Sequence, residues 1–394
     1  MKKRFLILFL TFFGINIFAQ DFNLNIQNFS SIYLNKKYYS EMKIVPSFNY
    51  SFEDFGYDFQ IKSELLFRFD SENFSHGLFR EDKRSVLDIQ QLWIQFQKEQ
   101  VSGFIGYKIF EDRLTDLVSP SDNFSPRDFT NLIGADPIIT EKIPSFSTGI
   151  KIGEENFLQI NINLFRPSRL AEGVWKPNLP ENFKFSDQKL PENYLQYNIR
   201  SGLSMFGFEF YFGFIDGHGY DPDYKISFSQ TGINIIPYYE RQKIYSFSFS
   251  KNILDLIFRF DGGYFIKENG KEDGQYVLAL EWIGQENLVL QIQYIGEFNS
   301  YSDEFTKYSY RKALNNSLTY YIEKNIDDMQ TFKVGLNGSY NISKKDGYLG
   351  SSIKKNWNKL SVNVRLNLLY GPNDTFWGSY SKDNNFSFVL SYNL

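Results

Sequence analysis

Apolar and polar side chains alternate throughout residues 57–70. The odd positions are apolar apart from Ser63, and the even positions are polar or charged apart from Leu66. A period of two is that of a β-strand with one apolar and one polar face. Strands of soluble proteins are usually about 5–6 residues long. A much longer strand, with ionised groups on one face and aromatic rings on the other, predicts a barrel wall between lipid and water.

The same alternation recurs in residues 194–203, 254–264, 288–298, 360–370 and 386–394. In residues 254–264 it predicts that Phe258 faces lipid and that Arg259 faces the lumen. We expect the last of these segments to pair with the first strand of the chain. The reason is that an open sheet edge in lipid would leave backbone groups without hydrogen-bond partners.

Connections of two lengths separate the alternating segments. Short ones fall near residues 98–100, 153–155, 205–206, 251–252, 285–286, 325–327 and 356–358, and long ones span 71–84, 111–141, 168–192, 217–238, 300–310 and 371–382. Short periplasmic turns and long extracellular loops are typical of outer-membrane barrels. The predicted fold class is all-β, a transmembrane antiparallel barrel of about 18 strands, or about 16 if the weakly alternating residues 23–34 form no wall strand.

Aromatic residues make up 19% of the chain. No segment after residue 20 approaches the ~18 uninterrupted apolar residues of a spanning helix. Rings near strand ends are expected in girdles at the depth of the lipid headgroups, and they are Trp93, Phe110, Tyr238, Tyr239, Trp282, Tyr320, Tyr370 and Trp377. The alternative is a soluble sandwich with an aromatic core, but the apolar face here continues from strand to strand.

Residues 1–19 have the features of a secretory signal peptide. Lys2, Lys3 and Arg4 precede an apolar stretch at residues 5–13, and Ala19 offers a cleavage point before Gln20. We therefore expect Sec-type export and a single outer-membrane barrel domain at residues 20–394. The expected partners are the barrel-assembly machinery, membrane lipid and lipopolysaccharide. The chain has no Cys, which excludes lipoprotein acylation, disulfides and thiol catalysis.

Charges of both signs are nearly balanced, with 42 basic and 46 acidic residues. No basic stripe points to nucleic acid. Alternation places several charges on the polar face, and rings of mixed charge filter solutes by size and dipole. The lumen-lining candidates are Asp58, Lys62, Glu64, Arg68, Asp255, Arg259, Asp261, Glu297, Lys333 and Arg365.

Residues 111–141 form the longest connection, and they contain three prolines, Pro120, Pro126 and Pro137. A connection of this length is usually functional or disordered. It is the third extracellular loop in the predicted topology, and it has two interpretations. Either it folds into the lumen and narrows it, or it is a solvated surface loop. The constriction candidates are Arg113, Asp116, Asp122, Arg127 and Asp128.

One part of the sequence resembles a family of Bacteroidetes-like outer-membrane barrels of Gram-negative bacteria. The matching residues, which occur at a compatible spacing, are Gly106, the segment Pro126-Arg127-Asp128, and Pro144 at the start of the next strand. That family has a Gly-Arg-Gln strand end, a Trp-Gly pair, an Asn-Pro-Arg-Asp segment and an Ile-Pro pair. Here Tyr107-Lys108 replaces Arg-Gln, and Phe110-Glu111 stands in place of Trp-Gly. The resemblance implies a porin-like or export-associated barrel.

The two histidines, His76 and His218, are the candidates for rim catalysis. No nucleophile stands at a defined spacing from either one. Asp216, Asp221 and Asp223 could bind a divalent cation, but a turn rich in Gly, Asp and Pro explains them without one. We therefore expect no enzyme activity, no metal and no cofactor.

The function that the sequence favours is an outer-membrane porin for passive diffusion of small polar or charged solutes. Two alternatives remain open. One is a non-conducting barrel that serves as a surface scaffold, an adhesin or an exporter accessory. The other is a rim enzyme.

Overall fold

The computed structural model describes residues 21–33, 38–70, 86–110, 115, 118–122, 125–130, 141–170, 182–229, 232–284, 287–298, 309–327 and 329–394. The predicted signal peptide at residues 1–19 lies outside these residues. So do two of the constriction candidates, Arg113 and Asp116, and one of the histidines, His76.

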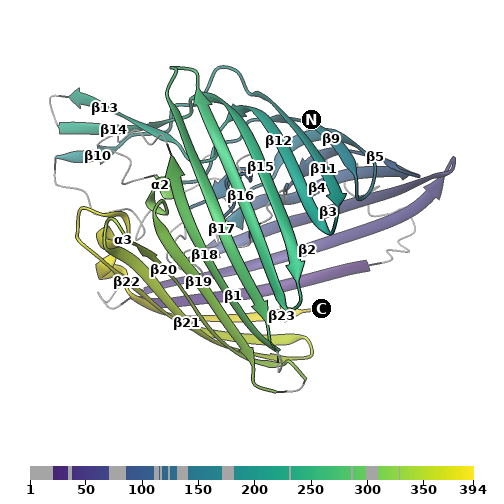
Figure 1. The fold of residues 1–394 in the computed structure, drawn as a ribbon. Helices are drawn as coiled ribbons and strands as arrows, with labels where there is room; N and C mark the ends of the chain where they lie inside the picture. Colours follow the sequence, from purple (N-terminus) through teal and green to yellow (C-terminus); the bar gives the residue numbers. More distant parts are fainter. Residues whose placement is uncertain are drawn as a thin grey trace, which may run out of the picture.

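Eighteen strands form one antiparallel sheet that closes into a barrel (Figure 1). They are β1 (Asp21–Tyr33), β2 (Tyr38–Asp54), β3 (Tyr57–Asp70), β4 (Leu87–Lys98), β5 (Val101–Lys108), β8 (Ser145–Ile152), β9 (Phe157–Leu164), β11 (Leu195–Met205), β12 (Phe208–His218), β15 (Arg241–Ile253), β16 (Leu256–Lys267), β17 (Glu272–Ile283), β18 (Leu288–Phe298), β19 (Ser317–Asn325), β20 (Phe332–Asn341), β21 (Asp346–Trp357), β22 (Leu360–Tyr370) and β23 (Asn385–Asn393). The prediction of 18 strands is confirmed.

Closure depends on β1, the strand with the weakest sequence pattern. It pairs with β2 on one side and with β23 on the other. Its alternation is weak because two of its inward side chains, Phe29 and Tyr33, are apolar and enter a buried cluster inside the barrel. The prediction that the last strand closes the barrel on the first is also confirmed.

The outer surface is apolar and the inner surface is polar. In β9, Leu158, Ile160, Ile162 and Leu164 are 37–48% exposed, whereas Asn161 and Asn163 between them are buried. This arrangement is the reverse of a soluble protein, and it fits a wall with lipid outside and polar groups inside. No helix in the described part of the chain is long and apolar enough to cross a membrane.

Tight turns join the strands at one end of the barrel. Phe55 and Gly56 between β2 and β3, and Phe206 and Gly207 between β11 and β12, have positive φ angles of 51°, 71°, 55° and 71°. Two consecutive residues of positive φ are those of the hairpin turn whose twist matches the strands. We call this end of the barrel the short-turn end.

The connections at the other end are longer and carry further structure. They contain β6 (Arg127–Asp128), β7 (Glu141–Lys142), β10 (Phe183–Phe185), β13 (Asp223–Ser229), β14 (Gly232–Tyr238), α2 (Tyr310–Ala313), α3 (Phe376–Ser379) and the 3-10 turn η4 (Ser381–Asp383). Strands β10, β14 and β13 form a small separate sheet beside the barrel (Figure 1).

The prediction of aromatic girdles is wrong for four of its residues. Trp93, Phe110, Tyr239 and Trp377 are all buried. Trp93 occupies an inward position of β4, where its Nε1 donates to Gln91. The other three lie in connections that pack against protein. Nearness to a strand end in sequence does not distinguish a ring at the lipid surface from one that turns inward.

Phe247, halfway along β15, tests the orientation of the wall. Its ring packs on the outer surface among Phe210, Phe212, Phe249 and Phe260. We expect Phe247→Arg to lower the free energy of unfolding by about 2–4 kcal/mol, the cost of an arginine facing lipid near the midplane. Denaturant titration in lipid vesicles measures this loss. Phe247→Leu is the control, and an equal effect of both variants would contradict the outward orientation.

Candidate functional site

The candidate site is the connection between β5 and β8, whose described residues are 109–110, 115, 118–122, 125–130 and 141–144. We call it the lumen segment. It lies inside the barrel and touches the inner wall in two places. Its described residues form no strand of the barrel wall, so side-chain contacts with the wall fix its position.

The first contact is with β16. Asp261 of this strand is fully buried, and its Oδ2 accepts hydrogen bonds from Thr115 Oγ1 at 3.4 Å, from Ser121 Oγ at 3.0 Å and from Ser119 Oγ. Ser248 of the neighbouring strand donates to Asp261 Oδ1 at 2.8 Å. Hydroxyl donors therefore surround a carboxylate in the middle of the wall.

Gly263 makes this contact sterically feasible. A Cβ atom at Gly263 would lie 3.1 Å from the carbonyl oxygen of Pro120. That distance is too short for a comfortable van der Waals contact, so a side chain here would push the segment away from β16. The glycine leaves room for the close approach of the backbone.

The second contact is a buried ionic network on the wall formed by β2, β3 and β4. Arg68 Nε lies 2.7 Å from Glu41 Oε1, and Arg68 Nη2 lies 3.7 Å from Asp128 Oδ2 of the segment. Asp128 Oδ2 also lies 3.2 Å from Arg169 Nη1, and Arg169 binds Asp88 as well. With Arg166, 3.2 Å from Asp88 Oδ1, three arginines meet three carboxylates. The charges balance, as burial of ions requires.

The electrostatics of Arg169 show how the network holds together. Burial by itself would lower the pKa of Arg169, but the carboxylates of Asp128 and Asp88 outweigh it and raise the pKa above its ordinary value. The side chain is therefore a fixed positive charge. Arg169 lies beyond β9, so a second connection takes part in docking the lumen segment.

Backbone pairing joins these two connections. The amide of Phe129 donates to the carbonyl of Arg169 at 2.8 Å, and the amide of Arg169 donates to the carbonyl of Arg127 at 2.9 Å. Ser168 Oγ accepts from the Arg127 amide at 2.8 Å. β6 also pairs with β7. Residues 127–128 are thus fixed from both sides.

The two contact points lie nearly opposite each other in the barrel. The strands between β3 and β16 divide into two similar sets around the barrel. In one direction they are β4, β5, β8, β9, β11, β12 and β15, and in the other direction they are β17 to β23, β1 and β2. The segment therefore extends across the lumen from one wall to the other.

A third group of charges lies between the two walls. Asp122 Oδ2 is 3.0 Å from Arg127 Nη2 and 2.7 Å from Lys142 Nζ. The Arg127 guanidinium also lies 4.9 Å from the centre of the Tyr220 ring. The described constriction candidates, Asp122, Arg127 and Asp128, are brought close together in this part of the segment.

The remaining lumen-lining candidates are spread along the inner wall. Lys62 pairs with Glu64, Arg259 with Glu281, and Lys333 with Glu323, at 3.1, 2.5 and 2.7 Å. Glu297 accepts from Asn315 and Asn316 beside α2. Asp58 and Arg365 lie on β3 and β22. Asp255 is not on the wall, because it is exposed in the turn between β15 and β16.

Sequence reasoning missed an apolar cluster inside the barrel. Phe129 of the segment packs on Tyr310, and Tyr310 packs on Phe376. The cluster also contains fully buried Trp377 and inward residues of the wall such as Val277. A signal for it existed, because residues 276–280 are apolar on both faces of the strand and so predict burial on the inner side as well.

The three aspartates considered for a cation bind separate partners. Asp216 pairs with Arg241, Asp221 accepts from Ser309 and from the Arg311 amide, and Asp223 pairs with Lys267. Among the described residues, no group of three or more His, Asp or Glu side chains has a metal-binding arrangement. His218 Nε2 lies 3.1 Å from the Asn193 carbonyl oxygen.

Known structures of similar fold place this barrel in a class. No protein-family model matches the chain, and no curated protein matches its sequence. OccK2 (OpdF) of Pseudomonas aeruginosa superposes with a TM-score of 0.56 at 11% identity, over 95% of this chain and 97% of that one. OccD3 (OpdP) of the same species gives 0.54 at 8% identity, over 95% and 90%. The chain has the fold of an eighteen-strand porin-like barrel.

Arg169 tests the second contact. We expect Arg169→Met to lower the free energy of unfolding by about 3 kcal/mol, because it removes a buried charge from between two carboxylates. Arg166 and Arg68 still neutralise part of the charge of the two carboxylates. The expected loss in the free energy of unfolding is therefore near the lower end of the range for broken buried ion pairs. Lys333→Met, which breaks a half-exposed pair, should cost at most about 1 kcal/mol. Denaturant unfolding compares the two, and equal losses would contradict the network.

Proposed function

We propose that the protein is an outer-membrane channel that passes small polar or charged solutes by passive diffusion, and that the lumen segment is its constriction. The observation that carries this proposal is the attachment of the segment to nearly opposite walls, at Asp261 and at Arg68. A segment held at both ends inside a closed barrel reduces the cross-section open to solutes. Fixed charges there act on a permeating ion with little water to screen them.

The location follows from the same proposal. An apolar outer surface needs a membrane, and a closed barrel is the β-structure that satisfies all its backbone groups in lipid. Residues 1–19 would direct export through the Sec route, and the barrel-assembly machinery would insert the mature chain. Lipid and lipopolysaccharide would then surround it. The resemblance of Pro126-Arg127-Asp128 to a loop signature of Bacteroidetes-like barrels supports this assignment.

One observation favours a second candidate. The apolar cluster around Trp377 and Tyr310 occupies part of the lumen, as in a barrel whose interior is filled. Such a protein would be a surface scaffold, an adhesin or an exporter accessory. Recording ionic current across a planar bilayer separates the two candidates, because only the channel conducts.

The contact with β16 should limit conductance. We expect the double variant Ser119→Ala, Ser121→Ala to raise the single-channel conductance, because it removes two hydrogen bonds that hold the segment to Asp261. Ser248→Ala is the matched control, since it removes a hydrogen bond to the same carboxylate from the wall. If the double variant conducts like the wild type, the segment does not narrow the path.

The charge at Arg127 should influence selectivity. We expect Arg127→Glu to shift the reversal potential in a salt gradient towards cations, and Arg127→Gln to shift it about half as far, because an ion responds to fixed charge at a narrow point. An unchanged reversal potential in both variants would place Arg127 away from the path.

A further inference from the structure

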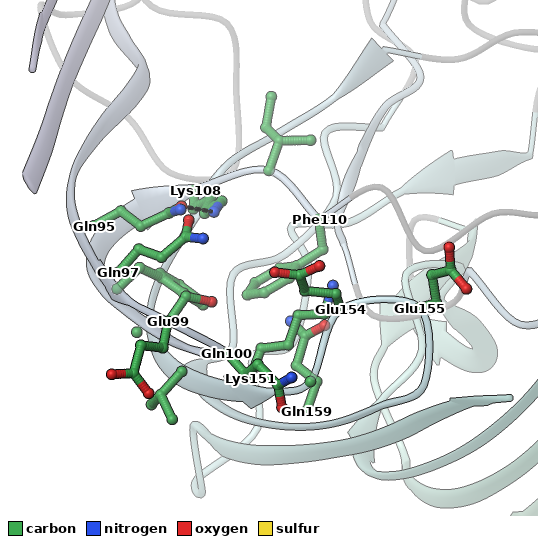
Figure 2. Close-up of a pocket in the computed structure, with 16 residues that line it drawn as sticks. Gln95, Gln97, Glu99, Gln100, Lys108, Phe110, Lys151, Glu154, Glu155 and Gln159 are labelled. Carbon is green, nitrogen blue, oxygen red and sulfur yellow. Dashed lines mark hydrogen bonds between the residues drawn. The ribbon is translucent and has the colours of Figure 1, made fainter. Parts of the chain in front are cut away.

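A cavity of about 520 Å³ lies inside the barrel, between the lumen segment and the short-turn end (Figure 2). Strands β4, β5, β8 and β9 form its walls, together with the turns from β4 to β5 and from β8 to β9. Phe110 of the lumen segment bounds one end, where its ring packs edge-on against Phe104 with the ring centres 5.7 Å apart. The volume falls within the range of ligand pockets, about 300–1,000 Å³. The cavity is therefore large enough for a small organic solute.

Carboxamide side chains line this cavity from several sides. Gln95 and Gln97 come from β4, Gln159 comes from β9, and Gln100 lies in the turn between β4 and β5 (Figure 2). A carboxamide has two donor hydrogens and an acceptor oxygen, and it carries no net charge. Glutamines from separate segments thus surround the cavity with neutral donors and acceptors.

Two of these glutamines are held in fixed orientations by neighbouring side chains. Gln95 Oε1 accepts a hydrogen bond from Lys108 Nζ at 3.2 Å, so the amide nitrogen of Gln95 is the end that can donate to a solute. Gln159 Nε2 donates to Asn161 Oδ1 at 3.1 Å, so Gln159 Oε1 is the end that can accept. The cavity therefore presents a fixed donor on β4 and a fixed acceptor on β9.

This donor and this acceptor together match the chemistry of hydroxyl groups. A hydroxyl both donates and accepts, so a solute with several hydroxyls can bind Gln95 and Gln159 at the same time. A carboxylate only accepts and an ammonium group only donates, so either one would leave one of the two glutamines without a partner. Polar groups left unpaired are the reason that a site rejects a ligand of the wrong chemistry.

The charges around the cavity do not favour ions of one sign. Two lysines and three glutamates line it, namely Lys108, Lys151, Glu99, Glu154 and Glu155. A cleft concentrates ions when charges of one sign line it, and here both signs are present in similar number. The hydrogen-bonding groups of the glutamines therefore decide which solute binds.

We propose that this cavity binds neutral solutes with several hydroxyl groups, the chemistry of saccharides. The amide nitrogen of Gln95 would donate to one hydroxyl oxygen, and Gln159 Oε1 would accept from another. Gln97 and Gln100 would bind further hydroxyls. The inference rests on the proposed channel, since it names the class of solute that pauses beneath the lumen segment. Binding itself can be measured whether or not the barrel conducts.

Isothermal titration calorimetry on the purified detergent-solubilised barrel tests the proposal with four related probes. They are glucose, tetrahydropyran, which is the same ring without hydroxyl groups, and the two charged relatives glucuronate and glucosamine. We expect glucose to bind, and tetrahydropyran to bind about ten-fold more weakly or not at all, because it cannot satisfy both glutamines. Glucuronate and glucosamine should bind no more tightly than glucose.

Methionine substitutions test the glutamines themselves, because methionine is close to glutamine in shape but has no amide. The side chain of Gln97 makes no hydrogen bond with the described residues, so Gln97→Met leaves the wall intact. We expect it to weaken glucose binding about three-fold, and the double variant Gln97→Met, Gln159→Met to weaken it about ten-fold. Gln27→Met is the matched control. It changes a glutamine of β1 that does not line the cavity, and it should leave glucose binding unchanged.

Each other outcome overturns the proposal. Absence of glucose binding, or unchanged glucose binding in both Gln97 variants, rejects this cavity as the site. Equal binding of tetrahydropyran rejects the role of the hydroxyl groups. Much tighter binding of glucuronate would show an anion site instead, and much tighter binding of glucosamine a cation site. A barrel that conducts salt but fails these tests loses only this inference, and a barrel that binds glucose but carries no current loses only the proposed channel.

Discussion

The pairing of β1 with β23 is the constraint on which the rest of the structure depends. Nine residue pairs, from Asn25 with Asn393 to Tyr33 with Asn385, join the first strand to the last. Without them, two rows of backbone donors and acceptors would face hydrocarbon, where each unpaired group costs several kcal/mol. Closure also fixes which residues face inward, because every strand takes its register from its neighbours. The inward-facing residues in turn determine which side chains line the lumen and contact the lumen segment.

Inside the closed wall, two different kinds of interaction hold the lumen segment. At β16, neutral hydroxyl groups surround Asp261. At β3, Asp128 joins a balanced network of buried ions around Arg68 and Arg169. Breaking the ionic contact leaves an uncompensated charge, which costs more than losing a hydroxyl hydrogen bond. The ionic contact is therefore the firmer of the two, and the hydroxyl contact is the point at which the segment can be released with the least disturbance.

The sequence predicted the wall far better than the interior. Alternation with a period of two repeats in strand after strand, so the number of strands and the orientation of Phe258 and Arg259 could be derived from it. The charges and prolines of residues 111–141 also pointed to this connection, whose described residues lie inside the barrel. Asp255 was misplaced because alternation does not say where a strand ends and its turn begins.

The partners of the lumen segment could not be predicted in the same way. Arg166 and Arg169 come from a different connection, and Asp88 lies on β4 beyond a shift of register between β3 and β4. Contacts between segments far apart in sequence do not produce a periodic pattern of apolar and polar residues. The buried positions of Trp377 and Tyr239 escaped prediction for the same reason.

The most direct test of the channel is the ionic current of the wild-type protein in a planar bilayer. We expect discrete, stable conductance steps in potassium chloride, each from one inserted barrel. A correctly folded, membrane-inserted protein that produces no steps would contradict the proposed channel and would favour a barrel with a filled lumen.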